Sequence, residues 1–319
     1  MLNPLQRRML RRRIFQSVPV LILATFSVFM LLKLLPGDVA ITLAGENATT
    51  ERIEEIRRIY GLDRPLLVQY GHWAFNAVQG DLSNSLLSGE AVTTTLARVF
   101  PNTLFIVCYA ILLSVAIGVP LGLLAIVRAG GLADRLVMLG SSIGVALPNF
   151  WIAMIFVVVL ALNRQWFPAT GFVSPWQDLS AAIWHATLPA VALAASGISE
   201  VARQLRSSLV EVLNSQHFRT LHAKGLPFGP ILWKHGLRNV SVNLLTVISL
   251  LVNRTLAATV VVEVVFAIPG MGNTIVNATL QRDFPVVQGA VLAMVLTVIT
   301  VNLITDMLYS ILDPRISQR

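Results

Sequence analysis

Long apolar runs, each close to 20 residues or longer, alternate with short polar stretches along the chain of 319 residues. A helix of about 20 apolar residues crosses roughly 30 Å of hydrocarbon. Only 13% of the residues are charged, whereas soluble domains carry about 25%. A membrane β-barrel would show shorter segments of alternating hydrophobicity. The pattern therefore predicts an all-α polytopic membrane protein with six transmembrane helices.

Arginines, prolines and turn-forming residues mark the ends of some of the six expected spans or interrupt them. The first follows a cluster of five arginines and is not followed by a small-x-small cleavage site, which favours a retained helix over a signal peptide. Pro148 interrupts the third span and should kink it. The fifth is followed by a turn-rich loop at residues 267–285. The expected spans cover residues 14–35, 101–127, 136–162, 181–202, 242–266 and 286–312.

The distribution of lysine and arginine predicts the orientation of these spans. With the N-terminus inside, one side of the membrane carries fifteen positive residues and the other side carries seven. Positive charge collects on the cytoplasmic side of membrane proteins. Both termini, and the basic stretch between the fourth and fifth spans, are therefore predicted to be cytoplasmic.

Between the first two spans, residues 36–98 predict surface helices. Thr49 or Thr50 can cap a helix that ends at Gly61, and a second helix is expected to start at Pro65. Trp73, together with its neighbour His72, is expected at the membrane interface.

The sequence lacks the motifs of common enzymes. No lysine follows a glycine, so a phosphate-binding P-loop is absent and the chain cannot hydrolyse ATP by itself. The single cysteine, Cys108, can form neither an internal disulfide nor a zinc cluster. An enzymatic role is therefore disfavoured, and we expect neither a metal nor a nucleic acid partner.

Arg254 and Glu263 are ionisable residues inside the fifth span, where charge is expensive and often functional. They are nine residues apart and point to opposite faces of a helix, so they should not pair with each other. Either could face an aqueous pathway. The alternative is an interhelical contact for Arg254 and a position at the membrane interface for Glu263.

The polar stretch from His217 to Asn239 contains two glycines and two prolines, which prevent one uninterrupted helix. Residues 217–224 can form about two helical turns that Gly225 would end. The predicted result is a short helix lying across the membrane surface.

A series of motifs, in this order, resembles the inner-membrane permease subunits of bacterial dipeptide, oligopeptide and nickel ABC importers. The resemblance covers nearly the whole chain. The later motifs are the most specific. The motifs are LLPGD (34–38), YGLDRPLLVQY (60–70), FPNTL (100–104), ALPNFW (146–151), FPATG (167–171), FRTLHAKGL (218–226), HGLRN (235–239), VVEVVFAIPGMGNTIVNATLQRDFPVVQG (261–289) and NLITDMLYSILDPRI (302–316).

This resemblance implies that residues 218–226 are the family's version of the "EAA" loop, which couples the permease to an ATPase. Arg219, Thr220 and Leu221 stand where Glu-Ala-Ala would, so the expected contact uses aromatic and basic residues and not a carboxylate. The implied coupling residues are Phe218, Arg219, Leu221, Ala223, Lys224, Gly225, Leu226, His235 and Arg238.

The resemblance also implies the fold of a type I ABC importer and its partners. These are a second homologous permease, two P-loop ATPase subunits that use ATP and Mg, an extracytoplasmic solute-binding protein and the lipid of the bacterial inner membrane. The chain itself would bind no cofactor. Residues 1–35 would form the N-terminus and first transmembrane helix, and residues 36–98 a periplasmic loop with amphipathic helices. Residues 99–319 would form a five-helix permease core with a cytoplasmic coupling loop at 206–239.

The implied cargo is a di- or oligopeptide. Nickel chelates, glutathione or another small solute remain open, and so does a secondary transporter or channel outside the ABC class, although no inverted repeat is visible. Residues near the pathway or the binding protein would be Arg254, Glu263, Pro269, Gly270, Gly272 and Asp283.

The orientation can be tested with a reporter fused near residue 225. We expect activity from a cytoplasmic reporter and none from a periplasmic one, because the basic stretch should stay inside. Activity that is confined to the periplasmic reporter would contradict the predicted topology.

Overall fold

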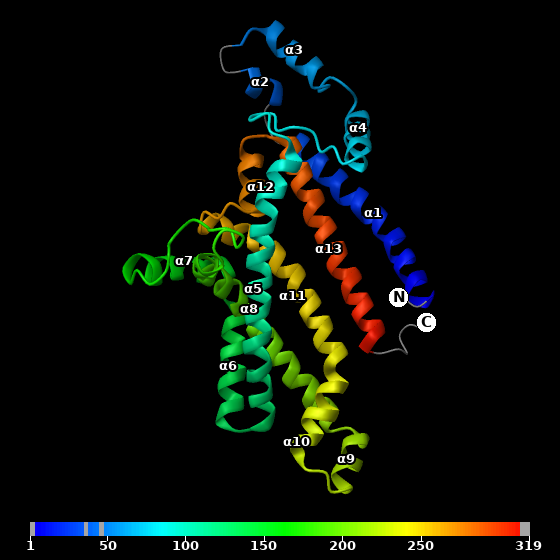
Figure 1. Ribbon diagram of the computed structural model, residues 1–319, viewed down its shortest axis with the longest axis vertical. Helices are drawn as coiled ribbons and strands as arrows, with labels where there is room; N and C mark the ends of the chain where they lie inside the picture. Colours follow the sequence, from blue (N-terminus) through cyan, green and yellow to red (C-terminus); the bar gives the residue numbers. More distant parts are fainter. Residues whose placement is uncertain (1–3, 35–37, 45–47, 313–319) are drawn as a thin grey trace. The chain divides into compact units, whose positions relative to one another are not determined.

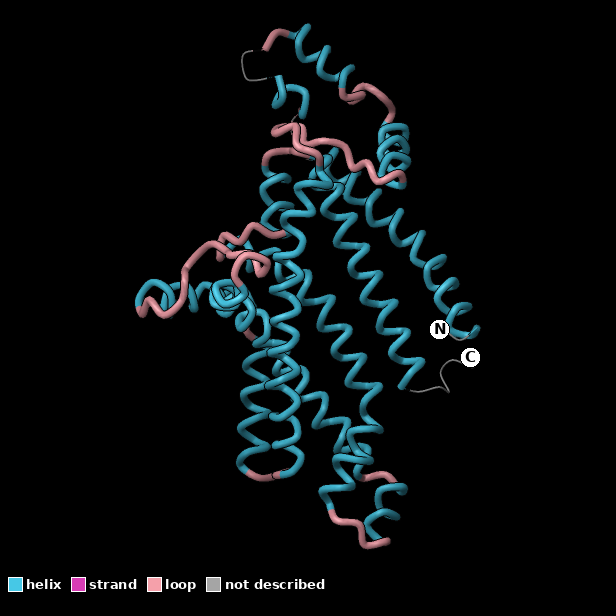
Figure 2. The backbone as a smooth tube through the Cα atoms, viewed as in Figure 1, coloured by secondary structure: helices cyan, strands magenta, loops and turns pink. Residues whose placement is uncertain are grey.

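The computed structural model describes residues 4–34, 38–44 and 48–312 (Figure 1). The middle of the motif at 34–38, and the predicted C-terminal tail with the end of the motif at 302–316, lie outside the described residues. Helix dominates the described part, where Figure 2 shows loops as the connections between helices and no strand. Five helical segments are long and apolar enough to cross a membrane, and a bent pair of helices can supply a sixth. The described residues thus confirm the all-α membrane fold.

Packing divides the chain into two compact units. Unit 1 comprises residues 1–13, 102–268 and 298–319, and unit 2 comprises residues 14–101 and 269–297. Three of the four boundaries fall inside long helices, α1 (Pro4–Leu34), α5 (Val92–Val127) and α13 (Phe284–Leu312), and the fourth follows α11. This grouping differs from the three parts expected from the order of the chain, because one long helix can contribute to two clusters of side chains.

Helix α8 (Leu179–Leu213) is the centre of unit 1. It packs against α6 (Leu132–Ala146), α7 (Asn149–Phe156) and α11 (Leu237–Val265). Small residues on a membrane helix let neighbouring backbones approach closely. The buried small residues of α8 include Ala182, Ala186, Ala190, Ala194, Gly197 and Ala202.

Two glycines of α5 mark where this helix approaches α8 most closely. A Cβ atom at Gly118 would lie 2.9 Å from the carbonyl oxygen of Ile198, and one at Gly122 would lie 2.9 Å from that of Ala202. These distances are too short for a carbon atom to occupy. Glycine is therefore required at both positions by the spacing of the two helices.

The third expected span is broken and not merely kinked. Helices α6 and α7 meet at an angle of 95°, and α7 continues into the π-helical segment η1 (Val157–Asn163). Leu147 adopts an extended conformation with ψ of 128°, as favoured for a residue that precedes proline. The expectation of a single kinked helix was wrong because Pro148 begins a new helix.

Helices on both sides of the predicted basic stretch are longer than expected. Helix α8 runs to Leu213, and α9 (Gln216–Ala223) follows it. A second continuous segment, Phe228–Val265, joins α10 (Phe228–Pro230), η2 (Ile231–Gly236) and α11. Pro227 and Pro230 lie before and within the first turn, where a missing N–H costs no helical hydrogen bond, so they start the helix and do not break it.

Unit 2 contains helices α2 (Val39–Ala44), α3 (Thr50–Ile59), α4 (Leu66–Val78) and α12 (Met271–Leu280). The hydroxyl of Thr49 accepts a hydrogen bond from the backbone N–H of Arg52 at 3.4 Å, which confirms the predicted cap. Its apolar core combines α1, α5, α12 and α13 through Leu32, Val92, Leu96, Met271, Phe284 and Val287.

Several expectations for unit 2 were wrong. Helix α5 begins at Val92 and passes through Pro101, which does not open it. Residues 267–285 include the ten-residue helix α12, whose first turn is closed by the Thr274 hydroxyl donating to the Gly270 carbonyl at 2.7 Å. Trp73 is only 9% exposed and lies beside Tyr70, so its ring is packed inside the unit, and its place at a membrane interface stays a prediction.

Replacing Gly118 with alanine should destabilise unit 1, because the new methyl group would force α5 away from α8. Overpacking of this kind costs about 1–3 kcal/mol. The thermal midpoint of the detergent-solubilised protein should fall.

Gly140→Ala is the matched control, since a Cβ there meets no atom within 4 Å. Its thermal midpoint should be unchanged or slightly higher, because alanine favours the helix. Equal midpoints for the two variants would contradict the close approach.

Candidate functional site

The segment between α8 and α11, residues 214–236, is called the coupling segment below. Its short helix α9 ends in a Schellman motif, in which Leu226 N–H donates to the Leu221 carbonyl at 3.3 Å and Gly225 N–H donates to the His222 carbonyl at 2.9 Å. Gly225 has a φ of +77°, in the left-handed region that suits glycine. The short helix ended by Gly225 is thus present, as predicted.

The side chain of Phe218 is only 1% exposed, so it is buried within the chain. The imidazole of His217, next to it, lies 6.5 Å from that of His235 in η2, centroid to centroid. Helix α9 is therefore held against η2. The expectation that Phe218 forms part of an external apolar contact was wrong, because its ring anchors α9 and is not available to a partner.

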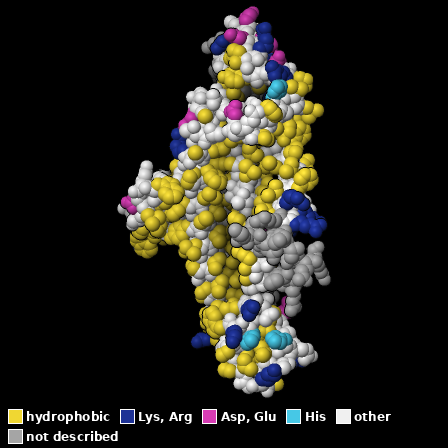
Figure 3. Space-filling view, turned by 45° about the vertical axis from the view of Figure 1, so that its right-hand side comes forward, with side chains coloured by type: hydrophobic (Ala, Val, Ile, Leu, Met, Phe, Trp, Pro, Cys, Tyr) yellow, Lys and Arg dark blue, Asp and Glu magenta, His cyan; other side chains and the backbone are white. Residues whose placement is uncertain are grey.

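The remaining predicted coupling residues differ in exposure. Leu221, Leu226 and His235 are half-buried. Figure 3 shows Lys, Arg and His side chains gathered with apolar ones at the end of unit 1 that carries α9 and α10. The exposed members of the set are Arg219, Ala223, Lys224, Gly225 and Arg238.

Trp233 is a further exposed residue of this segment that sequence reasoning missed. Its side chain is 63% exposed on η2, and Phe228 at the start of α10 is 42% exposed. The sequence feature that could have identified Trp233 as an exposed contact residue is its position next to Lys234 and His235. The exposed surface of the coupling segment is therefore basic and aromatic.

An ion pair joins the start of α6 to the last turns of α8. Arg206 donates through Nε to Asp134 Oδ1 at 2.5 Å and through Nη2 to Asp134 Oδ2 at 2.7 Å. The backbone N–H of Gly130 donates to the same carboxylate at 2.9 Å. Sequence reasoning missed this pair, because it started the third span at residue 136 and placed Arg206 in a loop.

Arg254 and Glu263 have different partners, as their spacing predicted. Arg254 Nη1 donates to Glu200 Oε2 at 2.7 Å, while its side chain remains 69% exposed. Glu263 is fully buried and accepts a hydrogen bond from the Thr103 hydroxyl at 2.6 Å, while its depth in the membrane stays a prediction. Glu200 was missed, although it is an ionisable residue inside the predicted fourth span.

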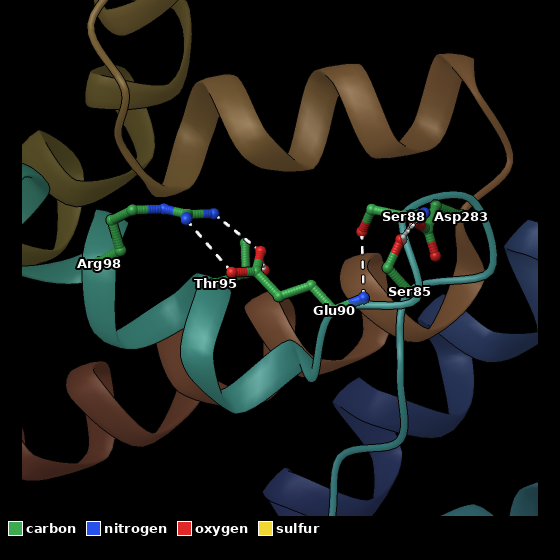
Figure 4. A network of polar contacts seen from close by, with 6 residues as sticks. All are labelled: Ser85, Ser88, Glu90, Thr95, Arg98 and Asp283. Carbon is green, nitrogen blue, oxygen red and sulfur yellow. Dashed lines mark hydrogen bonds and ion pairs between the residues drawn. The ribbon is translucent and has the colours of Figure 1, made fainter.

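Of the residues expected near the pathway or the binding protein, four lie in unit 2, namely Pro269, Gly270, Gly272 and Asp283. Gly270 and Gly272 are buried at the start of α12, and Pro269 is exposed. Asp283 is 5% exposed and accepts a hydrogen bond from the Ser85 hydroxyl at 2.5 Å (Figure 4). It also accepts a hydrogen bond from the Leu86 backbone N–H at 3.1 Å. Asp283 thereby anchors the loop that precedes α5.

Glu90 closes the same loop onto the first turns of α5. Its carboxylate accepts a hydrogen bond from the Thr95 hydroxyl at 2.7 Å and from Arg98 Nη2 at 2.8 Å (Figure 4). The bond from Thr95 and then the Arg98 guanidinium hold the pKa of the Glu90 carboxyl below its usual range. The carboxylate form is therefore the one that closes the loop.

The part of the chain that the structure describes contains no group of three His, Cys, Asp or Glu side chains able to hold a metal ion. The features that set this molecule apart are its long apolar helices and the exposed coupling segment between two of them.

Comparison with known protein families shows which family the chain belongs to. Residues 118–318 match the family of binding-protein-dependent transport system inner membrane components, and residues 6–107 match the N-terminal region of such components. The chain belongs to this family. It is a permease component of an ABC transporter, which confirms the resemblance seen in the motifs.

Relatives match along nearly the whole chain. A protein named as a peptide transport system permease of Brucella abortus (strain 2308) is 36% identical over 96% of this chain and 97% of its own length. The oligopeptide transport system permease protein AppB of Bacillus subtilis (strain 168) is 35% identical over 96% and 98%, respectively. The glutathione transport system permease protein GsiC of Escherichia coli is 35% identical over 96% and 97%.

A solved structure supports the fold. A chain from inward-facing conformations of the MetNI methionine ABC transporter superposes with a TM-score of 0.57. The alignment covers 69% of this chain and 97% of that chain at 17% identity. The predicted type I importer fold is thereby confirmed.

Replacing Asp283 with alanine should free the loop before α5, because Ser85 and the Leu86 N–H lose their acceptor. Limited proteolysis should cut faster between residues 81 and 91. Asp283→Asn keeps one acceptor oxygen and should give an intermediate rate. Cleavage of the alanine variant at the wild-type rate would show that the loop is held by other contacts.

Proposed function

We propose that this permease forms half of the translocation pathway of an ATP-driven importer for di- or oligopeptides. A solute-binding protein outside the membrane would deliver the cargo. The observation that carries the proposal is the coupling segment, a short exposed basic helix that Phe218 fastens to the body of unit 1. The printed names of several relatives, which are peptide or oligopeptide permeases, support the choice of cargo.

The partners in this proposal supply what the chain lacks. The sequence has no P-loop motif, so two partner ATPase subunits would bind ATP and Mg and would hydrolyse the nucleotide. A second homologous permease would complete the pathway. This chain would bind no cofactor.

The distribution of basic residues supports the proposed orientation in the inner membrane. Both termini and the coupling segment would face the cytoplasm, where the ATPase subunits reside, because the positive residues are concentrated in these stretches. The same orientation would place the loop held by Asp283 on the side of the solute-binding protein.

The described contacts suggest how motion would pass from the ATPase to the spans. Closure of the ATPase dimer would displace α9 through its exposed cations. Because Phe218 is buried and His217 lies against His235, the displacement would reach η2 and not be lost in a flexible loop. Helices α8 and α11, which flank the coupling segment and pack against each other, would then change their arrangement.

Glutathione is a second candidate cargo, because a relative of similar identity is named for its transport. Glutathione is itself a small peptide-like carboxylate. The two cargoes can be separated by competition.

Reversing the charge of an exposed coupling residue should weaken the binding of the ATPase subunit to the permease. In Lys224→Glu we expect uptake of a labelled dipeptide and co-purification of the ATPase to fall at least tenfold, roughly the effect of losing 1.4 kcal/mol of contact free energy. Membrane insertion should be normal, because Lys224 is exposed.

The matched control is Arg128→Glu, an exposed charge reversal in the connection between α5 and α6. It should retain uptake and the ATPase. Equal behaviour of the two variants would contradict the role of α9. If labelled glutathione were taken up and an excess of dipeptides did not compete with it, the cargo would be glutathione.

A further inference from the structure

Arg254 of α11 carries an exposed charge within a helical segment that is long and apolar enough to cross a membrane. Its guanidinium donates through Nη1 to Glu200 Oε2 of α8, a second such helix, at 2.7 Å. The side chain of Arg254 nevertheless stays 69% exposed, and that of Glu200 is 21% exposed. Lipid tails would strip these charges of hydration at a high cost in free energy, so the exposed side of the pair should meet water or a polar surface.

Polar residues continue from Glu200 along one side of α8. Ser196 lies four residues before Glu200, and Arg203 and Ser207 lie three and seven residues after it. This spacing brings side chains to the same side of a helix. Arg203 and Ser207 are exposed, and Ser196 is half-buried. These four residues of α8, together with Arg254, are called the polar face below, and the face extends over about three turns of α8.

Acidic side chains on the neighbouring elements do not neutralise the polar face. Glu211, also on α8, lies about three further turns from Glu200. The described acids of α6, α11 and α13 each have another partner: Asp134 with Arg206, Glu263 with Thr103 and Asp306 with Arg13. The polar face therefore carries two arginines against one glutamate, which favours contact with a group of negative charge.

The guanidinium of Arg254 keeps donors available for such a group. An arginine side chain has five N–H donors, and Arg254 makes one hydrogen bond to the described residues, the bond to Glu200. Carboxylates bind guanidinium groups through two parallel hydrogen bonds, and every peptide with a free C-terminus carries one.

We propose that the polar face lines the water-filled transport pathway and that Arg254, held in place by Glu200, binds the carboxylate of a passing peptide. This inference rests on the proposed import function and adds to it the residue that meets the cargo and the cargo group that it meets.

The first experiment measures whether the polar face is in contact with water, using the complete transporter in nanodiscs. Ala257 is exposed one turn after Arg254. It is replaced in an Ala257→Cys variant that also carries Cys108→Ser, so that one thiol remains. We expect this thiol to react with the charged reagent methanethiosulfonate ethylsulfonate, because thiols react as thiolates and thiolates form in water.

The control is the native thiol of the wild type. Cys108 is exposed on α5, one turn before Leu112, which is 62% exposed on the same apolar side of that helix. Lipid should exclude the charged reagent there, so we expect Cys108 to react about tenfold more slowly or less. Equal rates for the two thiols, as expected if lipid or the second permease covered the polar face, would overturn the proposal.

The second experiment locates the carboxylate of the cargo. The complex, without a binding protein to select the ligand, is irradiated with alanyl-photoleucine, a dipeptide that carries a diazirine, or with its C-terminal amide. We expect the acid to label residues 196–207 and 250–261 about tenfold more than the amide does, as mapped by mass spectrometry. Arg254→Gln should remove this difference, because the charged hydrogen bond to the carboxylate is lost.

Arg128→Gln is the matched control, since Arg128 is an exposed arginine outside the polar face. It should keep the preference for the acid. Equal labelling by the acid and the amide in the wild type would refute the role of Arg254, and this comparison holds even if Arg254→Gln fails to fold.

ATP-dependent uptake of the same dipeptide, with the binding protein present, distinguishes failure of this inference from failure of the import proposal. Uptake without acid-specific labelling would refute the role of Arg254 and leave peptide import intact. Absence of uptake by the wild type would refute the peptide cargo, and the contact between Arg254 and a peptide would be refuted with it.

Discussion

The close approach of α5 and α8 is the constraint on which the rest of unit 1 depends. Lipid tails are as apolar as leucine side chains, so membrane helices gain little from burying apolar surface and rely on close packing. Gly118 and Gly122 remove the side chains that would separate the two backbones. Once α8 is fixed in this way, its other faces can hold α6, α7 and α11, and its last turns can carry the coupling segment.

Several ionisable groups in the spans are matched by a specific partner. Asp134 is clamped by Arg206, Arg254 by Glu200, and Asp306 by Arg13 at 3.0 Å. Glu263 is buried against the hydroxyl of Thr103. Charge in hydrocarbon is costly unless it is paired or hydrated, so these contacts also limit how the helices can be arranged.

The number of spans, the helical class and the short helix ended by Gly225 could be predicted, because apolar length and glycine geometry are local properties of the sequence. The effects of the prolines could not be predicted from the sequence. Pro148 starts a helix after a sharp break, Pro101 lies within one, and Pro227 and Pro230 open one. Burial also escaped prediction, since a lone sequence does not show that Phe218 is enclosed, that Asp283 meets Ser85 or that Arg254 meets Glu200.

The segment Phe228–Val265 is 38 residues long and would extend about 57 Å as a regular helix. A rod of this length transmits displacement with little bending. Its second turn, η2, is π-helical, and such a turn contains one more residue than a regular one. If the extra residue moved along the rod, everything it passed would turn by roughly 100° about the axis without a break in the helix. The segment Phe228–Val265 can therefore transmit rotation about its axis as well as displacement along it.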